Sequence, residues 1–256
     1  DAIERLEVGA IKAMVFDLDG TLTPSKQAMT AEMAGEFARL TRTLSTGVIS
    51  GGSFQQFSRQ LLTPLQSQVF TPENLHLMPT CGTRYYRFEN GGWQVKYVLD
   101  MDPALAAKAK KVIAEVARSL GYWCRNPAGE IIEDRGSQLT YSALGQQAGR
   151  EEKDAWDPSG EKRAEIASRA GALLPELTVL SGGSTSVDIT MKGIDKAYGI
   201  EEFLQQTGLH PPQVLFVGDR LDPDGNDYPA VRTGVQTRAT TGPEQTQEII
   251  AQVLAG

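Results

Sequence analysis

The segment VFDLDGTLTPSKQ (residues 15–27) is the most informative part of the sequence, because an apolar run stops there at two aspartates on either side of one leucine. The run IKAMVF (11–16) has the short, mostly apolar character of a buried parallel strand. Residues i and i+2 of an extended segment point the same way, so we expect Asp17 and Asp19 to share one side of the strand end. Two carboxylates directed into one dry site repel each other, which predicts a cation beside them.

Strands of this kind alternate with helices along much of the chain. TGVIS (46–50) and VLFVGD (214–219) are predicted to be two further buried strands. Helices are predicted to begin at Thr30, a typical N-cap residue, and near Ser53, and a last helix covers EQTQEIIAQVL (244–254). This alternation predicts a doubly wound α/β sheet, in which ligands gather at the carboxyl ends of the strands. The residues expected at such ends are Asp17, Ser50 and Asp219.

The middle of the chain has a different pattern. RYYRFENGGWQVKYV (84–98) contains two strand-like runs around Asn90-Gly91-Gly92, which predicts a β-hairpin. Helices are predicted over about 103–120 and 160–172. Strand-like segments follow one another at 130–134, 137–143, 177–180 and 186–191.

Hairpins and helices grouped in this way indicate a separate antiparallel α+β domain inserted into the α/β core. We expect the core to comprise residues 1–82 and 193–256, and the inserted domain to comprise residues 83–192. The aromatic side chains of the hairpin would form either its hydrophobic core or a homodimer surface on the inserted domain. They are Tyr85, Tyr86, Phe88 and Trp93.

Composition argues against several classes of partner. The 256 residues include 25 basic and 32 acidic ones, a net charge of −7, and no basic cluster suited to a phosphate backbone, so no nucleic-acid partner is expected. No apolar run approaches the roughly 20 residues of a membrane span, and the N-terminal residues lack signal-peptide character. The two cysteines, Cys81 and Cys124, have neither disulfide-framework nor metal-ligand spacing. A cytoplasmic protein without membrane attachment is expected.

Histidine is scarce, which limits the possible chemistry. His76 and His210 are the only two, so a histidine-rich zinc site is excluded and a Ser-His-Asp triad is disfavoured. Both are expected to be surface or loop residues. The chemistry must therefore rest on carboxylates, hydroxyls, lysine and a hard metal ion.

The residues at the strand ends suit phosphoryl chemistry with magnesium. Asp219 would add an oxygen to those of Asp17 and Asp19, and Mg²⁺ prefers a few carboxylates together with waters and phosphate. One aspartate can then attack phosphorus while the other carries a proton. Lys196 would offset the charge that builds on a transferring phosphoryl group. Short donors suited to phosphoryl oxygens are available at Gly20, Thr21, Ser50, Gly51 and Gly52.

Four short motifs, in their order and spacing over the whole chain, resemble those of the haloacid dehalogenase superfamily of phosphotransferases. The motifs are FDLDGT (16–21), the serine of ISGG (49–52), the lysine of GIDKAYG (193–199) and GDRLDPDGND (218–227). The resemblance implies a doubly wound, Rossmann-like α/β core. An inserted α+β domain between the second motif and the lysine is the type-IIB cap arrangement of that superfamily.

The resemblance also implies roles for individual residues. Asp17 would be the nucleophile that becomes an aspartyl-phosphate, and Asp19 the general acid/base. Ser50 and Lys196 would hold the phosphoryl group. Mg²⁺, the implied cofactor, would be held by Asp17, the backbone carbonyl of Asp19, and Asp219, with Asn226 and Asp227 in support.

Within the superfamily, the chain resembles the eukaryotic-type phosphomannomutases. The similar segments are DGTLTPSKQAMT (19–30), EDRGS (133–137), QAGR (147–150), SGGSTSVDIT (181–190) and GNDYP (225–229). In those enzymes the corresponding residues bind a sugar phosphate. The resemblance implies the same role for Lys26, Arg135, Arg150, Ser186 and Asp188.

One departure bears on the activity. Those mutases carry a further cap arginine, whereas residues 136–149 contain no Arg or Lys, and losing a bidentate donor weakens the grip on a bisphosphate. Arg84, Arg87 and Arg125 are the candidates to replace it. The sequence therefore favours a Mg²⁺-dependent phosphatase of small phosphorylated metabolites, here hexose phosphates. The alternatives are a phosphohexomutase and a non-catalytic ligand-binding domain.

Overall fold

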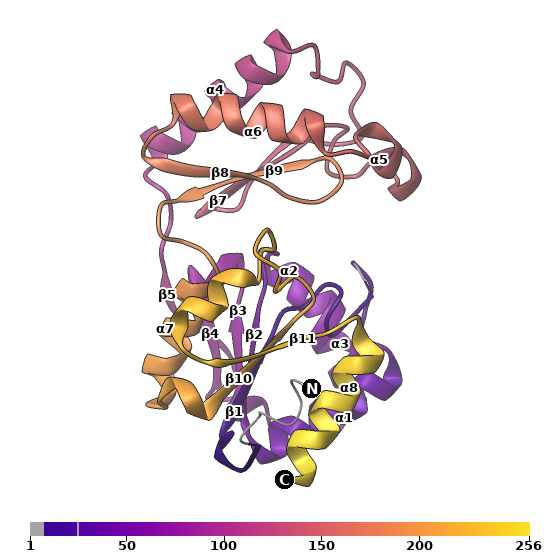
Figure 1. Ribbon diagram of the computed structural model, residues 1–256, viewed down its shortest axis with the longest axis vertical. Coiled ribbons are helices and arrows are strands. Elements are labelled where there is room, and N and C mark those ends of the chain that lie inside the picture. The colour runs from indigo at the N-terminus through magenta and orange to yellow at the C-terminus, as the bar shows by residue number, and fades with distance from the viewer. Residues whose placement is uncertain (1–7, 25) are drawn as a thin grey trace. The chain divides into compact units, whose positions relative to one another are not determined.

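The computed structural model describes residues 8–24 and 26–256 and divides the chain into two compact units (Figure 1). The core unit comprises Asp1–Val98 and Ile194–Gly256, and the inserted unit comprises Leu99–Gly193. Each unit has its own sheet and its own hydrophobic clusters. The prediction of an α/β core with an inserted α+β domain is therefore confirmed.

The core unit is built on a seven-stranded sheet with the order β11-β10-β1-β2-β3-β4-β5. The first five strands in this order are parallel, and β4 and β5 are antiparallel additions at one edge. The strands are β1 Ala13–Phe16, β2 Ser45–Ile49, β3 Leu75–Met78, β4 Arg84–Glu89, β5 Gly92–Val98, β10 Val214–Gly218 and β11 Gln236–Ala239.

Helices cover both faces of this sheet. α1 (Ala31–Thr43) and α8 (Pro243–Ala255) lie on one side of the strands in Figure 1, and α7 (Lys196–Thr207) lies on the other. Strand β1 contacts the helices on both faces, because successive side chains of a strand point to opposite faces of the sheet. Its Met14 and Phe16 join the cluster of α1 and α8, while Ala13 and Val15 join the cluster of α7. The apolar run before Asp17 is thus buried on both faces, as expected of a central parallel strand.

The predicted helix starts are confirmed by their caps. The Thr30 hydroxyl accepts from the Met33 N–H at 3.2 Å, and the Ser53 hydroxyl accepts from the Gln56 N–H at 3.4 Å. The segment after Ser53 is irregular, with α2 Phe54–Phe57, a π-helical turn Ser58–Leu62 and α3 Thr63–Leu65. Short 3₁₀ turns are η2 Val8–Ala10, η4 Pro72–Asn74, η5 Thr80–Gly82, η6 Pro211–Gln213 and η7 Tyr228–Thr233.

The predicted hairpin forms, but it belongs to the core unit. β4 pairs with β3 through His76↔Arg87 and Leu77↔Tyr86, so the expected boundary at residue 82 is wrong and the junction follows Val98. The physical reason is that β3, which the sequence did not indicate, leaves a sheet edge that β4 covers. Tyr85 is fully buried in the core, and Tyr86, Phe88 and Trp93 are partly buried. A homodimer contact through the inserted unit stays a prediction.

The inserted unit has a four-stranded antiparallel sheet with the order β6-β7-β9-β8. One face is apolar and packs against its two longer helices, through residues such as Tyr141 and Ile189. Thr140 and Asp188, on alternate strand positions, lie on the other face. The elements are α4 Pro103–Ser119, β6 Ile132–Asp134, β7 Gln138–Ser142, α5 Arg150–Trp156, α6 Glu161–Leu173, β8 Leu177–Ser181 and β9 Ser186–Met191.

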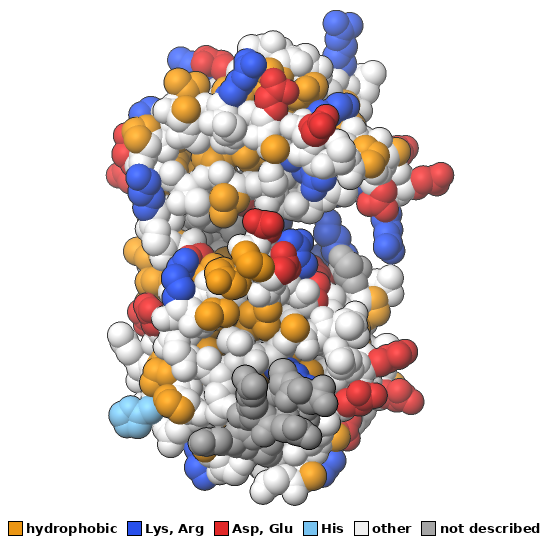
Figure 2. Space-filling view, in the orientation of Figure 1, with side chains coloured by type: hydrophobic (Ala, Val, Ile, Leu, Met, Phe, Trp, Pro, Cys, Tyr) orange, Lys and Arg blue, Asp and Glu red, His pale blue; other side chains and the backbone are white. Residues whose placement is uncertain are grey.

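The surface shows no strong segregation of charge on the side seen in Figure 2, where acidic and basic side chains are interspersed over each unit. Among the described residues, no helix is both long and apolar enough to cross a membrane.

His76 is not the surface residue that the sequence suggested. It lies in β3 with 2% of its surface exposed, its Nδ1 is 2.6 Å from the Tyr85 hydroxyl, and its ring contacts Phe203 edge-on. Burial, with a smaller contribution from the charge of Arg87, lowers the pKa of His76 from 6.5 to about 3. His210, by contrast, is exposed in the turn before β10, as expected.

This buried histidine predicts acid sensitivity. Its pKa is depressed on folding, so its contribution to stability is complete above pH 6.5 and is lost as the pH falls toward 3, by up to about 1.4 kcal/mol per pH unit. Urea unfolding between pH 7 and 4 should show a shallower pH dependence for His76→Gln than for wild type. His210→Gln is the matched control and should keep the wild-type slope. Equal slopes for all three proteins would contradict the assignment.

Candidate active site

The site forms where three neighbouring parallel strands end. Asp17 follows β1, Ser50 follows β2 and Asp219 follows β10, and these strands are adjacent in the order β10-β1-β2. Because parallel strands present their carboxyl ends at one edge of the sheet, the three side chains are brought together there. Lys196 joins them as the first residue of α7, directly after the N-cap Asp195.

The centre of the site is a buried lysine between two carboxylates. Lys196 Nζ lies 2.5 Å from Asp17 Oδ1 and 2.5 Å from Asp227 Oδ1, with 2% of the lysine side chain exposed. Burial alone would lower the pKa of Lys196, but the two carboxylates outweigh it, so the pKa is raised and the lysine is a fixed cation. This cation can neutralise charge on a transferring phosphoryl group.

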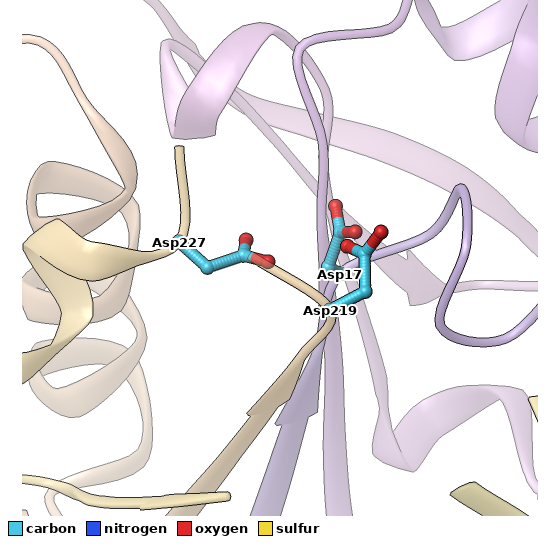
Figure 3. Close-up of side chains that lie close together, drawn as sticks. All are labelled: Asp17, Asp219 and Asp227. Carbon is cyan, nitrogen blue, oxygen red and sulfur yellow. The ribbon is translucent and has the colours of Figure 1, made fainter. Parts of the chain in front are cut away.

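Three carboxylates converge on one point that suits a hard cation. Ligand oxygens of Asp17, Asp219 and Asp227 lie within 4.8 Å of one another, and Figure 3 shows Asp17 and Asp219 side by side with Asp227 reaching in from its loop. Burial, which outweighs the opposing effect of Lys196, raises the pKa of Asp17 to about 8. A divalent cation would reverse that shift, since it stabilises the ionised form. An all-oxygen donor set of this kind fits Mg²⁺.

Gly20 makes the approach of Asp219 possible. Its φ is +77°, and a Cβ at this position would lie 2.4 Å from Asp219 Oδ2. A side chain at residue 20 would therefore push Asp219 out of the carboxylate cluster. This explains why a glycine follows the second aspartate of the opening motif.

Asp227 organises the loop after β10. Its Oδ2 accepts from the Arg220 N–H at 3.0 Å while Oδ1 bonds Lys196, and the residue is fully buried. A Cβ on Gly218 would lie 2.4 Å from Asp227 Oδ2, so glycine is required there for the loop to close. Asn226, expected to support the metal, is exposed.

The Ser50 loop is held by a turn that the sequence did not indicate. Ser50 is buried, its Oγ accepts from the Gly52 N–H at 3.1 Å, and its carbonyl accepts from the Cys81 N–H at 3.0 Å. Cys81 and its two neighbours all have positive φ, between 47° and 86°. A Cβ on the last of them, Gly82, would lie 2.5 Å from the Gly199 Cα, so α7 packs directly on this turn. The turn thus links Ser50 to the helix that carries Lys196.

Thr21 and Gly51 complete the expected phosphate-binding set. Thr21 is buried and its Oγ1 donates to Asp17 Oδ2 at 3.3 Å, so it orients the carboxylate. Gly51 lies between Ser50 and Gly52 in the loop after β2.

Asp19 faces a different set of partners from Asp17. Its carboxylate accepts from the backbone N–H of Lys26 and from the side-chain amides of Gln56 and Gln60, at 2.7–3.1 Å. Lys26, predicted to bind the substrate, thus contacts Asp19 through its backbone N–H. The sequence did not indicate these two glutamines as partners of Asp19, because polar residues four positions apart on a helix ordinarily lie on its solvent-exposed face.

The expected substrate residues of the inserted unit lie on its turns and polar sheet face. Arg135 follows β6 and pairs with Glu133 at 3.2 Å, and Arg150 is the exposed first residue of α5. Asp188 Oδ1 accepts from the Thr140 hydroxyl at 3.0 Å, and Ser186 lies two positions earlier on β9. Of the suggested replacement arginines, Arg84 and Arg87 belong to β4 in the core unit, and Arg125 is exposed in the inserted unit.

The fold and the family match define a phosphotransferase of the haloacid dehalogenase superfamily, with an α/β core and an inserted α+β unit. The model of the eukaryotic phosphomannomutase family matches residues 33–256. The chain belongs to that family.

Curated relatives agree with this assignment, and solved structures share the fold. Phosphomannomutases of Dendrobium officinale and Arabidopsis thaliana are 26% and 25% identical, covering 92% and 84% of this chain and 91% and 84% of theirs. ATP-bound Plasmodium falciparum IMP-nucleotidase shares the fold with a TM-score of 0.76 at 15% identity, covering 99% of this chain and 62% of that one. A haloacid dehalogenase-like hydrolase from Bacteroides thetaiotaomicron shares the fold with a TM-score of 0.65 at 16% identity, covering 95% of this chain and 99% of that one.

Replacing the nucleophile predicted at Asp17 tests the site. Asp17→Asn should lower kcat by on the order of 1000-fold or more, because an amide cannot attack phosphorus. The fold should survive, since Lys196 keeps its ion pair with Asp227. Turnover of a phosphate monoester and the circular dichroism spectrum are the measurements. Asp222→Asn is the control, because Asp222 is an exposed carboxylate in the loop after β10. A folded Asp17→Asn variant that keeps a tenth of wild-type activity would refute the assignment.

Proposed function

We propose that this protein is a Mg²⁺-dependent phosphohexomutase, which moves a phosphoryl group between hydroxyls of a hexose phosphate. The observation that carries the proposal is the extent of the family match, because residues 33–256 include the whole inserted unit as well as most of the core. A shared phosphotransferase core alone would be compatible with any member of the superfamily. The match thus favours the mutase alternative over the phosphatase that the sequence favoured.

The core residues suit the chemistry of this proposal. Asp17 attacks phosphorus and the bond to the leaving oxygen breaks, while Asp19 delivers a proton to that oxygen. Lys196, with Ser50 and the amides of its loop, offsets the charge on the phosphoryl oxygens. Mg²⁺ held by Asp17, the Asp19 carbonyl and Asp219, with Asn226 and Asp227 in support, would supply further charge neutralisation. In a mutase, the phosphoryl group on Asp17 is then transferred to the free hydroxyl of a hexose monophosphate. The bisphosphate formed turns over in the site, returns its other phosphoryl group to Asp17 and leaves as the isomeric monophosphate.

Selection of the sugar phosphate is assigned in this proposal to Lys26 and to the inserted unit. Arginine guanidinium groups suit the phosphate that is not being transferred, because they can donate two parallel hydrogen bonds. A serine hydroxyl and an aspartate carboxylate suit sugar hydroxyls. The residues of the inserted unit in these roles are Arg135, Arg150, Ser186 and Asp188.

A phosphatase is the second candidate, on one specific observation. Residues 136–149 contain no Arg or Lys, so the stretch that follows Arg135 lacks a donor for a second phosphate. A weaker hold on the phosphate that is not transferred would let water, instead of a sugar hydroxyl, reach the aspartyl-phosphate.

The product decides between the two functions. A hexose 1-phosphate is incubated with enzyme, Mg²⁺ and a catalytic amount of the corresponding hexose 1,6-bisphosphate, and hexose 6-phosphate and inorganic phosphate are quantified together. A mutase should form hexose 6-phosphate faster than phosphate and should depend on the bisphosphate. Phosphate as the sole product, with no effect of bisphosphate, would establish the hydrolase instead.

Metal dependence is a separate prediction. Exhaustive chelation should lower activity by about 100-fold or more, and added Mg²⁺ should restore it, because the converging ligands are hard oxygens. Ca²⁺ should compete with Mg²⁺ but support little turnover, since its looser geometry misplaces the attacking carboxylate. Full activity in the metal-free protein would refute the proposed Mg²⁺ site.

A further inference from the structure

The two carboxylate oxygens of Asp19 are not equivalent. Oδ1 accepts two hydrogen bonds, from the Lys26 N–H at 2.8 Å and from Gln60 Nε2 at 2.7 Å. Oδ2 accepts one, from Gln56 Nε2 at 3.1 Å. Since each carboxylate oxygen offers about two lone-pair sites, Oδ1 is saturated by these donors and Oδ2 keeps an open position.

The orientation of the Gln60 amide follows from its surroundings. Gln60 is 3% exposed, and its Nε2 lies within 3.2 Å of three oxygens, namely Asp19 Oδ1, Thr23 Oγ1 and the Gln27 carbonyl. Only the NH₂ end of an amide can donate, so this end must face Asp19. Its Oε1 is buried without a partner among the described residues, and such an unpaired acceptor costs about 1–3 kcal/mol.

The backbone of Gln60 holds the same region. Gln60 lies in the π-helical turn Ser58–Leu62, and its carbonyl accepts from the Met29 N–H at 2.9 Å. With the side-chain bond to the Gln27 carbonyl, Gln60 therefore binds the segment around residues 26–29 at two points. That segment supplies the Lys26 N–H, the other donor to Oδ1. Single π-helical turns are often found at functional sites.

We propose that Gln60 is a positioning residue for proton transfer. It anchors Oδ1 of Asp19 directly and through the 26–29 segment, and so presents Oδ2 as the oxygen that gives its proton to the leaving oxygen of the phosphate ester. The inference rests on the proposed acid/base role of Asp19. Without Gln60 the carboxyl group can rotate, and its proton no longer points at the leaving group.

The test varies only the need for that proton. Phenyl phosphates with substituents from 4-nitro to none have nearly the same shape, but their leaving groups need protonation to increasing degrees. The quantity kcat/KM, measured by phenol release, covers the steps through phosphoryl transfer to Asp17. Gln60→Met, which retains the length of the side chain but has no donor, is compared with Gln55→Met on the exposed side of the same helical segment, and with Asp19→Asn.

Gln60→Met should lose about 10- to 100-fold in kcat/KM for unsubstituted phenyl phosphate but less than about threefold for the 4-nitrophenyl ester. Asp19→Asn should show the same pattern more strongly, and Gln55→Met should match wild type. Because the two esters are compared in one preparation, their ratio does not depend on the folded fraction. Should Gln60→Met be insoluble, Gln60→Leu takes its place, since it also lacks the donor and adds no charge beside Asp19.

The outcomes separate the inference from the function on which it rests. Equal losses on both esters in Gln60→Met, with Asp19→Asn still selective, would overturn the positioning role alone and leave Gln60 a structural residue. An Asp19→Asn variant without selectivity would overturn the acid/base assignment, and with it this inference.

Discussion

The core unit depends on one buried cation. Lys196 lies between Asp17 and Asp227, all three nearly inaccessible to solvent, and removing the lysine would leave two uncompensated carboxylates in a low-dielectric interior. The three residues come from the end of β1, the start of α7 and the loop after β10. Asp17 precedes the inserted unit in the chain and the other two follow it, so the ion pairs connect the two halves of the core. The buried charges that suit phosphoryl chemistry thus also hold the two halves of the core together.

Close backbone approach is the second constraint, and it explains the glycines of the motifs. Gly20 admits Asp219, Gly218 admits Asp227, and Gly82 lets α7 pack on the turn beside Ser50. Each glycine leaves room for a functional group or for the backbone that carries one. The motifs therefore specify contacts between distant strands as well as the identities of the reactive side chains. Close contacts of this kind fix the positions of charged groups within the core, and fixed charges are what electrostatic stabilisation of a transition state requires.

The errors of sequence interpretation share one cause, which is that sheet neighbours are not local in sequence. The turn of the hairpin 84–98 predicts the hairpin, but its place at the edge of the core sheet depends on β3. The four residues of β3, LHLM, include a histidine, and a polar residue is not expected in a buried strand. His76 is neutral inside that strand because the surrounding core removes it from water. Gln60 likewise has the pattern of a polar helix residue, and only the folding of the 26–29 segment against it buries its amide.

The sequence alone determined the α/β class, the helix caps at Thr30 and Ser53, the existence of an inserted α+β domain and the strand-end identity of Asp17, Ser50 and Asp219. These follow from apolar periodicity and turn chemistry, which are local properties. Only the tertiary structure decided which unit owns the hairpin, that Lys196 is shared by two carboxylates, and that Gln56 and Gln60 reach Asp19. Those facts depend on contacts between segments far apart in the chain, and a local pattern carries no information about which of its polar residues will be buried by them.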